Sequence, residues 1–248
     1  MDSQRKKDMS KDNSTDYQYE RYKGDMFLDM YTHDLYNNFD ASADEQIRKL
    51  EEKRSAINCK FDNTTNSSED VSTDFFYKML ENSYVDEEII AIYEMKIIYA
   101  YKLFELKVKR LLNIFYPNEA SRGLYKWENL KSFFKNKGVF LNKLNGYSDL
   151  NDLRVVNNNL KHSSEVDNEI LRIKEFSKAV DYDIEELKTF YERVKKSPIQ
   201  FLQVIADAIN EERFVFDNDK IEAIAHDLAK RMELKDVNLL FQKLKSKY

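Results

Sequence analysis

Four polar residues near the middle of the chain have side chains that can move a proton and hold a phosphate. They are Arg154, Asn158, Lys161 and His162. Histidine is the side chain whose unperturbed pKa lets it accept and donate protons near neutral pH. Arginine, lysine and asparagine supply the hydrogen bonds, charge-assisted or neutral, that phosphate oxygens accept. The segment 148–162 therefore carries the residue types that acid–base chemistry beside a phosphate requires.

The same segment has the apolar spacing of a helix with one side on a core. Its apolar residues, at intervals of three, three and four, are Leu150, Leu153, Val156 and Leu160. At about 100° per residue, a polar set falls on the opposite side. This set, which we call the polar face, is Asn151, Arg154, Asn158 and His162. We expect Ser148 to cap the helix, with Asp149 and Asp152 at the positive end of its dipole.

Three consecutive asparagines, Asn157–Asn159, make this helix unusual because asparagine is a mediocre helix former. The alternative interpretation is a surface helix with polar filler. In that case Lys161 and His162 only complement the negative end of the helix dipole.

The composition predicts an all-α protein. Four glycines and two prolines leave few tight turns for a sheet. Charged residues make up 34% of the chain, which fits helices with solvated outer faces, and 42% hydrophobic residues can build a core.

The sequence favours a cytoplasmic protein with no membrane span. There is no apolar run of about 18 residues, and the first residues lack the apolar core of a secretory signal. The single cysteine, Cys59, excludes an internal disulfide and favours a reducing compartment.

Positive charge is concentrated around the polar face. Residues 122–162 carry a local charge of +5, whereas the whole chain carries −5. Three lysines of this stretch, Lys126, Lys131 and Lys135, are candidate RNA contacts with Lys161. Tyr147 lies in the same stretch and could stack on a base, as could Tyr125 and Trp127, although for Trp127 we favour core packing.

Four regions are predicted along the chain. They are a disordered tail at 1–24, an N-terminal helical extension at 25–66, a helical bundle at 67–212 and a C-terminal helical pair at 213–248. A capping box at Ser42–Glu45 is expected to open a helix to about Asn58, and Ser67 to begin another. The central helix is expected from Asp86 to Tyr116. The tyrosine-rich N-terminal segment is expected to dock on the chain's own core or on a partner protein.

The C-terminal part of the bundle has similar start and stop signals. A short helix from Tyr125 to about Lys137 is expected to end at Gly138. Ser197–Gln200 combines a capping box with a proline in the first turn, which predicts a helix to about Glu212. Two amphipathic helices, near 218–233 and 235–246, complete the chain.

The order of these elements resembles the HEPN superfamily (higher eukaryotes and prokaryotes nucleotide-binding). These helical bundles include many RNA-cutting toxins and phage-defence effectors. The resemblance covers residues 70–212. The family signature is an arginine, often followed by a polar residue such as asparagine, and then a histidine after four to six intervening residues. Aligning His162 with the family histidine puts Asn158 on the polar position and Asn157 on the arginine.

The resemblance implies a metal-independent endoribonuclease without a cofactor, built as a homodimer with two motifs facing each other. In this family the arginine is thought to hold the scissile phosphate and the histidine to move protons at the RNA 2′-hydroxyl. Here Arg154 or Lys161 would have to supply the charge that Asn157 lacks; otherwise the site is inactive.

The other candidate residues fit exposed helix surfaces better than functional sites. His33–Asp34 and His226–Asp227 are isolated pairs that fit ordinary helix surfaces better than a metal site, and there is no zinc, dinucleotide or phosphate-loop motif. Two function classes therefore remain: a HEPN-like RNA-binding effector, and a catalytically inactive helical interaction module.

Overall fold

The computed structural model describes residues 19, 22–23, 35–64, 71–119, 123–124, 126–163 and 166–247. Every regular element within these ranges is a helix, which confirms the all-α class and the helical bundle. The predicted disordered tail at 1–24 lies outside the described residues, except for Tyr19, Tyr22 and Lys23. The first part of the predicted N-terminal extension, residues 25–34, also lies outside them.

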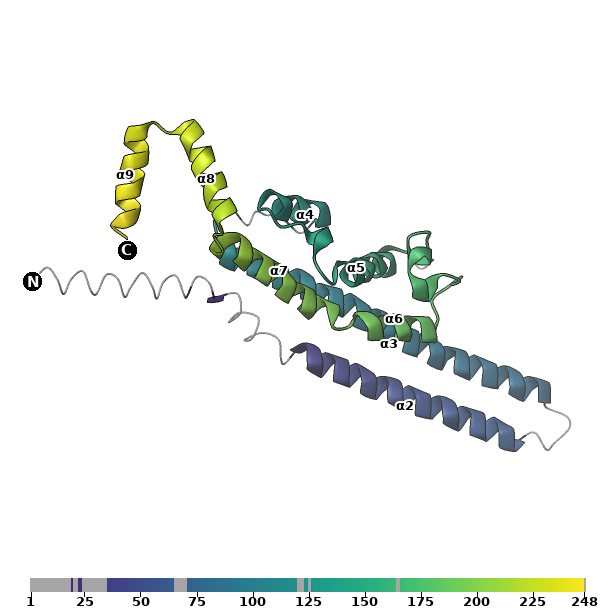
Figure 1. The fold of residues 1–248 in the computed structure, drawn as a ribbon. Helices are drawn as coiled ribbons and strands as arrows, with labels where there is room; N and C mark the ends of the chain where they lie inside the picture. The colour runs from purple at the N-terminus through teal and green to yellow at the C-terminus, as the bar shows by residue number, and fades with distance from the viewer. Residues whose placement is uncertain are drawn as a thin grey trace, which may run out of the picture.

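Helix α3, Val71–Phe115, is the centre of the bundle. It packs against α2, α5, α6 and α7, and the side chains of Ile97 and Phe104 are 0% and 1% exposed. The predicted central position is therefore confirmed (Figure 1). The expected helix start at Asp86 is wrong, because Asp86 lies inside α3, while the start expected at Ser67 lies outside the described residues. Residues 71–115 contain no glycine or proline that would break the helix, and the Asp86 side chain accepts a hydrogen bond from Arg54 at 2.8 Å.

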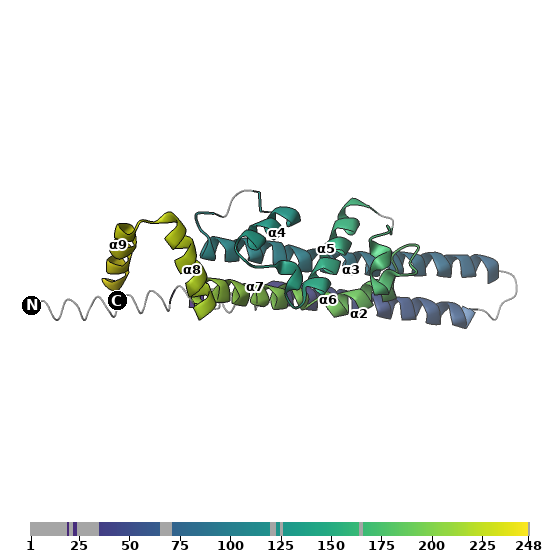
Figure 2. The same ribbon diagram turned by 45° about the horizontal axis from the view of Figure 1, so that its top comes forward.

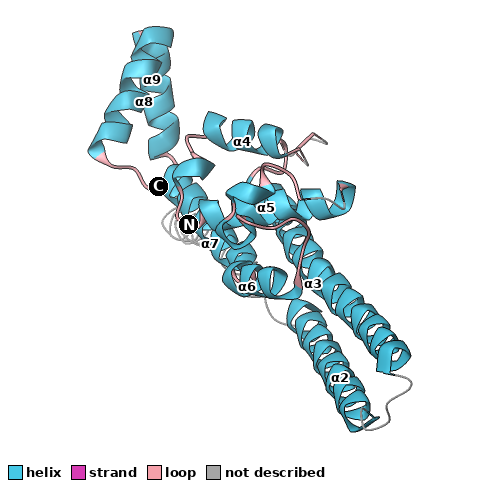
Figure 3. Ribbon diagram, turned by 90° about the vertical axis from the view of Figure 1, so that its right-hand side faces the viewer, coloured by secondary structure: helices cyan, strands magenta, loops and turns pink. Residues whose placement is uncertain are grey.

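Helix α2, Leu35–Thr64, runs alongside α3 in the opposite direction (Figures 1 and 3). The predicted capping box at Ser42 is wrong, because Ser42 and Glu45 lie inside this longer helix. Glu45 instead forms an ion pair with Arg48 at 2.7 Å.

A buried lysine joins α2 to α3. Lys96 is only 1% exposed, and its Nζ forms ion pairs with Asp44 and, at 3.1 Å, with Asp40. The same ammonium lies 4.5 Å from the centre of the Tyr191 ring. A buried charge is tolerated only when it is paired in this way, so this cluster fixes α2 on the bundle.

The remaining elements form the rest of the bundle and a C-terminal extension. In chain order they are α4 Trp127–Asn136, η1 Leu141–Lys143, α5 Tyr147–His162, η2 Ile170–Arg172, η3 Lys174–Phe176, α6 Ile184–Val194, α7 Ser197–Phe214, α8 Asn218–Arg231 and α9 Leu234–Lys245. Gly138 follows α4 with a φ of 82°, so the predicted helix end is confirmed. The capping box at Ser197 is wrong, since the Ser197 hydroxyl donates back to the Val194 carbonyl at 2.8 Å. Pro198 does lie in the first turn of α7.

Three layers of helices surround the core. Helices α6 and α7 follow one another along α3, and α5 packs against both of them as well as against α3 (Figure 2). Helices α8 and α9 project from the end of α7 away from this bundle (Figures 1 and 2). None of the described helices is both long and apolar enough to cross a membrane.

Candidate functional site

Helix α5, which carries the polar face, begins at a glycine rather than at the predicted serine cap. Gly146 precedes the helix with a φ of 82°, and its carbonyl accepts a hydrogen bond from the Leu150 amide at 3.2 Å. Glycine adopts this left-handed conformation without the strain that a Cβ atom would cause, and α5 therefore begins at Tyr147, two residues earlier than a Ser148 cap would give. Ser148 is therefore inside the helix and makes no capping hydrogen bond.

An arginine on α6 holds the first turns of α5. Arg193 contacts Asp149 at 2.6 Å and Asp152 at 3.1 Å, and it also pairs with Glu175 at 2.8 Å. Burial raises the pKa of Asp152 despite this pairing. Burial would also raise the pKa of Glu175, but the hydrogen bonds from Arg193 and the backbone, together with the positive charges of Arg193 and Lys174, outweigh it, and that pKa is lowered. The two aspartates thus anchor α5 in addition to complementing its dipole.

The apolar side of α5 is buried as predicted, and it includes one of the asparagines. Leu150, Leu153 and Val156 are 0% exposed, and Asn157 is 1% exposed. Asn157 donates its amide to Asn158 at 3.1 Å, while its own oxygen has no hydrogen-bond partner among the described residues. Asn157, aligned with the family arginine, is therefore not on the exposed surface with Asn158. It follows Leu153 by one helical turn and packs on the same side.

Asn159 is the second buried asparagine, and the sequence did not identify its role. Its oxygen accepts a hydrogen bond from the Tyr182 hydroxyl at 2.7 Å, and its amide donates to Asp167 at 3.1 Å. A backbone hydrogen bond from Ile170, with this amide, lowers the pKa of Asp167. The asparagine run thus positions the end of α5 against the segment that follows it.

Replacing Tyr182 with phenylalanine is expected to destabilise the fold by about 1–3 kcal/mol, because the buried Asn159 oxygen would lose its hydroxyl donor. Thermal unfolding followed by circular dichroism measures this change. Tyr84→Phe is the matched control, since Tyr84 is 54% exposed. Equal melting temperatures for the two variants would show that the buried hydrogen bond adds nothing.

Some residues of the polar face contact neighbouring side chains, and others are exposed. The guanidinium of Arg154 donates to Asn151 Oδ1 at 3.1 Å and lies 5.7 Å from the centre of the Trp127 ring. Asn158, Lys161 and His162 are exposed. Arg154 precedes His162 by two helical turns, a rise of about 12 Å. A strand of RNA could contact both residues, whereas one phosphate could not.

Aromatic rings connect the start of α5 to α4. Trp127 stacks on Tyr147 with ring centres 6.2 Å apart, and it meets Phe104 of the core at 6.3 Å. Trp127 therefore packs against the core, as we favoured. Tyr147 also contacts Phe201 at 6.2 Å and is half-buried, so only part of its ring is accessible.

Of the predicted lysines, Lys126 directly precedes α4, and Lys131 and Lys135 lie on it. Lys126, beside Trp127, is exposed, as is Lys135, while Lys131 pairs with Glu128 at 2.9 Å. From Tyr147 to His162 the helix rises by about 22 Å. The structure therefore groups Trp127, Tyr147 and Arg154, but places Lys161 and His162 at the far end of the same helix.

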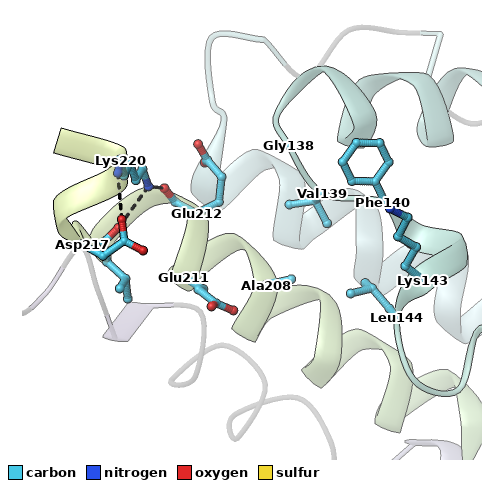
Figure 4. Close-up of a pocket in the computed structure, with 11 residues that line it drawn as sticks. Gly138, Val139, Phe140, Lys143, Leu144, Ala208, Glu211, Glu212, Asp217 and Lys220 are labelled. Atoms are coloured by element: carbon cyan, nitrogen blue, oxygen red, sulfur yellow. Dashed lines mark hydrogen bonds between the residues drawn. The ribbon is translucent and has the colours of Figure 1, made fainter. Parts of the chain in front are cut away.

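A surface pocket of about 460 Å³ lies elsewhere, between the η1 segment, α7 and the start of α8 (Figure 4). It includes no residue of α5, and its polar lining has both signs of charge, such as Lys143 and Glu211. Within the described ranges, no three His, Cys, Asp or Glu side chains are grouped as metal ligands would be.

Comparison of the chain with protein-family models, curated proteins and solved structures gives no match.

Proposed function

We propose that this chain is a HEPN-like RNA-binding protein whose α5 polar face contacts RNA, with His162 as general acid and base in metal-independent cleavage. The observation that supports this proposal is the exposed group Asn158, Lys161 and His162 at the end of α5, which is free to meet a ligand. Imidazole can move the proton of a 2′-hydroxyl, and the neighbouring amide and ammonium can bind phosphate oxygens.

The homodimer that the resemblance implies is part of this proposal, with the two α5 polar faces close together. Lys161, next to His162, supplies the cation that the buried Asn157 cannot, and Arg154 binds another phosphate of the same strand. Arg154 is already oriented by Asn151 and by the Trp127 ring, so little conformational entropy would be lost when it binds a phosphate. Phage defence or a toxin system is the setting in which proteins of this family often act.

The test is cleavage of single-stranded RNA by the purified full chain in EDTA. His162→Ala is expected to lower the cleavage rate by about 100- to 10,000-fold, the usual contribution of a general acid–base group. The melting temperature should stay unchanged because His162 is exposed. His226→Ala, which removes an exposed histidine of α8, is the matched control and should keep full activity. Cleavage that survives His162→Ala would place the chemistry elsewhere.

Arg154→Ala is expected to weaken RNA binding and cleavage together if this arginine makes the phosphate contact. Lys161→Ala should reduce the number of counterions released on RNA binding, measured from the salt dependence of the affinity, by about one.

The substitution that restores the family arginine, Asn157→Arg, would bury a guanidinium at a position that is 1% exposed. We therefore expect it to destabilise the fold, so its activity would be interpretable only beside its melting curve.

The second candidate function is a catalytically inactive interaction module. It is favoured by the burial of Asn157 and by the aromatic surface at the start of α3. Phe75 and Phe76 there are each 61% exposed, and Tyr77 is 53% exposed. Large exposed apolar patches mark protein interfaces. Wild-type protein that neither binds nor cuts RNA would favour this candidate.

A further inference from the structure

The C-terminal helices α8 and α9 carry an apolar surface that nothing in the described chain covers. Neither helix has a buried residue. The surface of α8 consists of Ile221, Ile224 and Leu228, and that of α9 of Leu234, Val237, Phe241 and Leu244. We call these residues the C-terminal seam. Their spacing of three and four is that of a coiled-coil interface.

The seam is strongly exposed. Leu234 is 76% exposed, Phe241 61% and Leu244 53%. Helices shorter than about 12–15 residues are marginal in water unless an apolar face packs against something. The two helices have 14 and 12 residues, so a partner surface would supply the stability that the monomer lacks.

Hydrogen bonds at the start of α8 fix the direction in which this helix leaves α7. The Lys220 ammonium, in the first turn of α8, donates to the carbonyls of Glu212 and, at 3.1 Å, of Val215 (Figure 4). The Asp217 side chain accepts from the Lys220 amide at 2.8 Å and caps α8. The chain then reverses at Met232–Glu233, so that α9 runs in the opposite direction to α8 (Figure 1). The seam is thus presented on a defined support.

We propose that the C-terminal seam binds the same seam of a second copy of this chain, with the two α9 helices antiparallel. The charges of α9 favour this occupant, since Glu233 and Asp236 outnumber Lys235 at its start, where Lys235 pairs with Glu233 at 2.8 Å, while Lys243 and Lys245 lie at its end. An antiparallel two-fold pairing brings each acidic start to the basic end of the partner helix. It also places Val237 against Phe241 of the partner subunit.

Helix α8 has the same distribution of charge along its length. Asp219 and Glu222 lie in its first half, and Lys230 and Arg231 at its end. A surface that pairs with itself must be complementary to itself across a two-fold axis, and both helices satisfy this condition. Two such helical pairs would form a four-helix bundle with the seams inside.

The seam is large enough for an interface at the lower end of the usual range. At on the order of 100 Å² for each of its six exposed apolar side chains, it offers roughly 600 Å² per copy. A standard stable interface buries about 800 Å² per partner, with a lower limit of about 600 Å². Val215 and Phe216, before the start of α8, are 45% and 54% exposed.

Sedimentation of the full chain at micromolar concentration is expected to give about twice the monomer mass of 29.7 kDa. Phe241→Glu should shift the protein to monomer, raising the dissociation constant at least 100-fold. Gln242→Glu is the matched control, because it adds the same charge at the next, exposed residue outside the seam, and it should remain a dimer. The mass of each variant is read beside its circular dichroism spectrum, so that loss of α9 is detected.

The orientation is tested by cross-linking in a Cys59→Ser background. Asn238→Cys lies near the proposed two-fold axis and should form a disulfide-linked dimer under mild oxidation. Leu244→Cys should not, because antiparallel pairing holds the two copies of this position far apart. Efficient cross-linking at Leu244→Cys, with none at Asn238→Cys, would overturn the antiparallel arrangement.

Two further outcomes would overturn the proposal as a whole. A monomeric wild-type chain would mean that another segment or another protein covers the seam. A Phe241→Glu variant that remains dimeric would mean that another surface, such as the α5 polar face, holds the two copies together without the seam. The two proposals are separated by the RNA assay: a monomeric Phe241→Glu variant that still cuts RNA would support the seam and would show that cleavage does not need the dimer.

Discussion

Replacing Phe104 with aspartate is expected to leave the chain largely unfolded at 25 °C. Phe104 is 1% exposed in the C-terminal half of α3, with its ring centre 6.3 Å from that of Trp127 and 6.2 Å from that of Phe201. Losing this ring costs about 3–5 kcal/mol, and burying an unpaired carboxylate adds several more. The sum is comparable to the whole stability of a typical domain, about 5–15 kcal/mol.

Circular dichroism and thermal melting measure this effect. Leu106→Asp is the matched control, since it makes a similar change two residues away at a side chain that is 46% exposed. The control should melt close to the wild type, because surface substitutions usually change stability by less than about 0.5 kcal/mol. A cooperative melting transition for Phe104→Asp near that of the control would mean that α3 is not the centre of the bundle.

Local signals predicted the class and much of the helix order. The low glycine and proline content excluded a sheet, and the apolar stripe of α5 correctly gave its buried side. Gly138 marked the end of α4 because a helix end that needs positive φ selects glycine. These features are encoded within a few residues of one another, so the sequence alone reveals them.

Helix starts that depend on long-range contacts could not be predicted in this way. Serine and acidic residues form capping patterns in many places, and only tertiary packing decides whether a helix begins there. Ser42 and Asp86 both lie inside longer helices for this reason. Asp86 instead pairs with Arg54 across the α2–α3 contact.

The candidate site was predicted in part. The exposure of Asn158 and His162 follows from helix periodicity. The burial of Asn157 was not predicted, because the alignment with the family arginine treated it as a site residue, although its spacing of four from Leu153 places it on the buried side. The partners of Asn159 come from residues 8 and 23 positions away, so no local pattern announces them. Lys96 is a similar case, because its partners in α2 are more than 50 residues away.

Replacing Arg193 with methionine is expected to lower the free energy of unfolding by about 3 kcal/mol at pH 7, because it breaks a partly buried ion pair. Glu175 is 3% exposed and Asp152 26% exposed, and both would lose the guanidinium, which would leave Glu175 only the longer contact with Lys174 at 3.6 Å. For a chain of this size the melting temperature should fall by about 6–12 °C. Arg231→Met, which breaks an exposed pair with Asp227, is the matched control and should have little effect.

The cost of Arg193→Met should depend on pH with a definite sign. In the wild type the pKa of Glu175 is lowered, so its stabilising contribution is present above the ordinary glutamate pKa and is lost as the pH falls. In the variant, Asp149, Asp152 and Glu175 repel one another, and this repulsion disappears on protonation. Both effects make the difference in the free energy of unfolding between the wild type and Arg193→Met largest above about pH 5 and smaller below about pH 4. Urea unfolding at both pH values measures it, and a difference that is constant with pH would mean that methionine acts through packing rather than through charge.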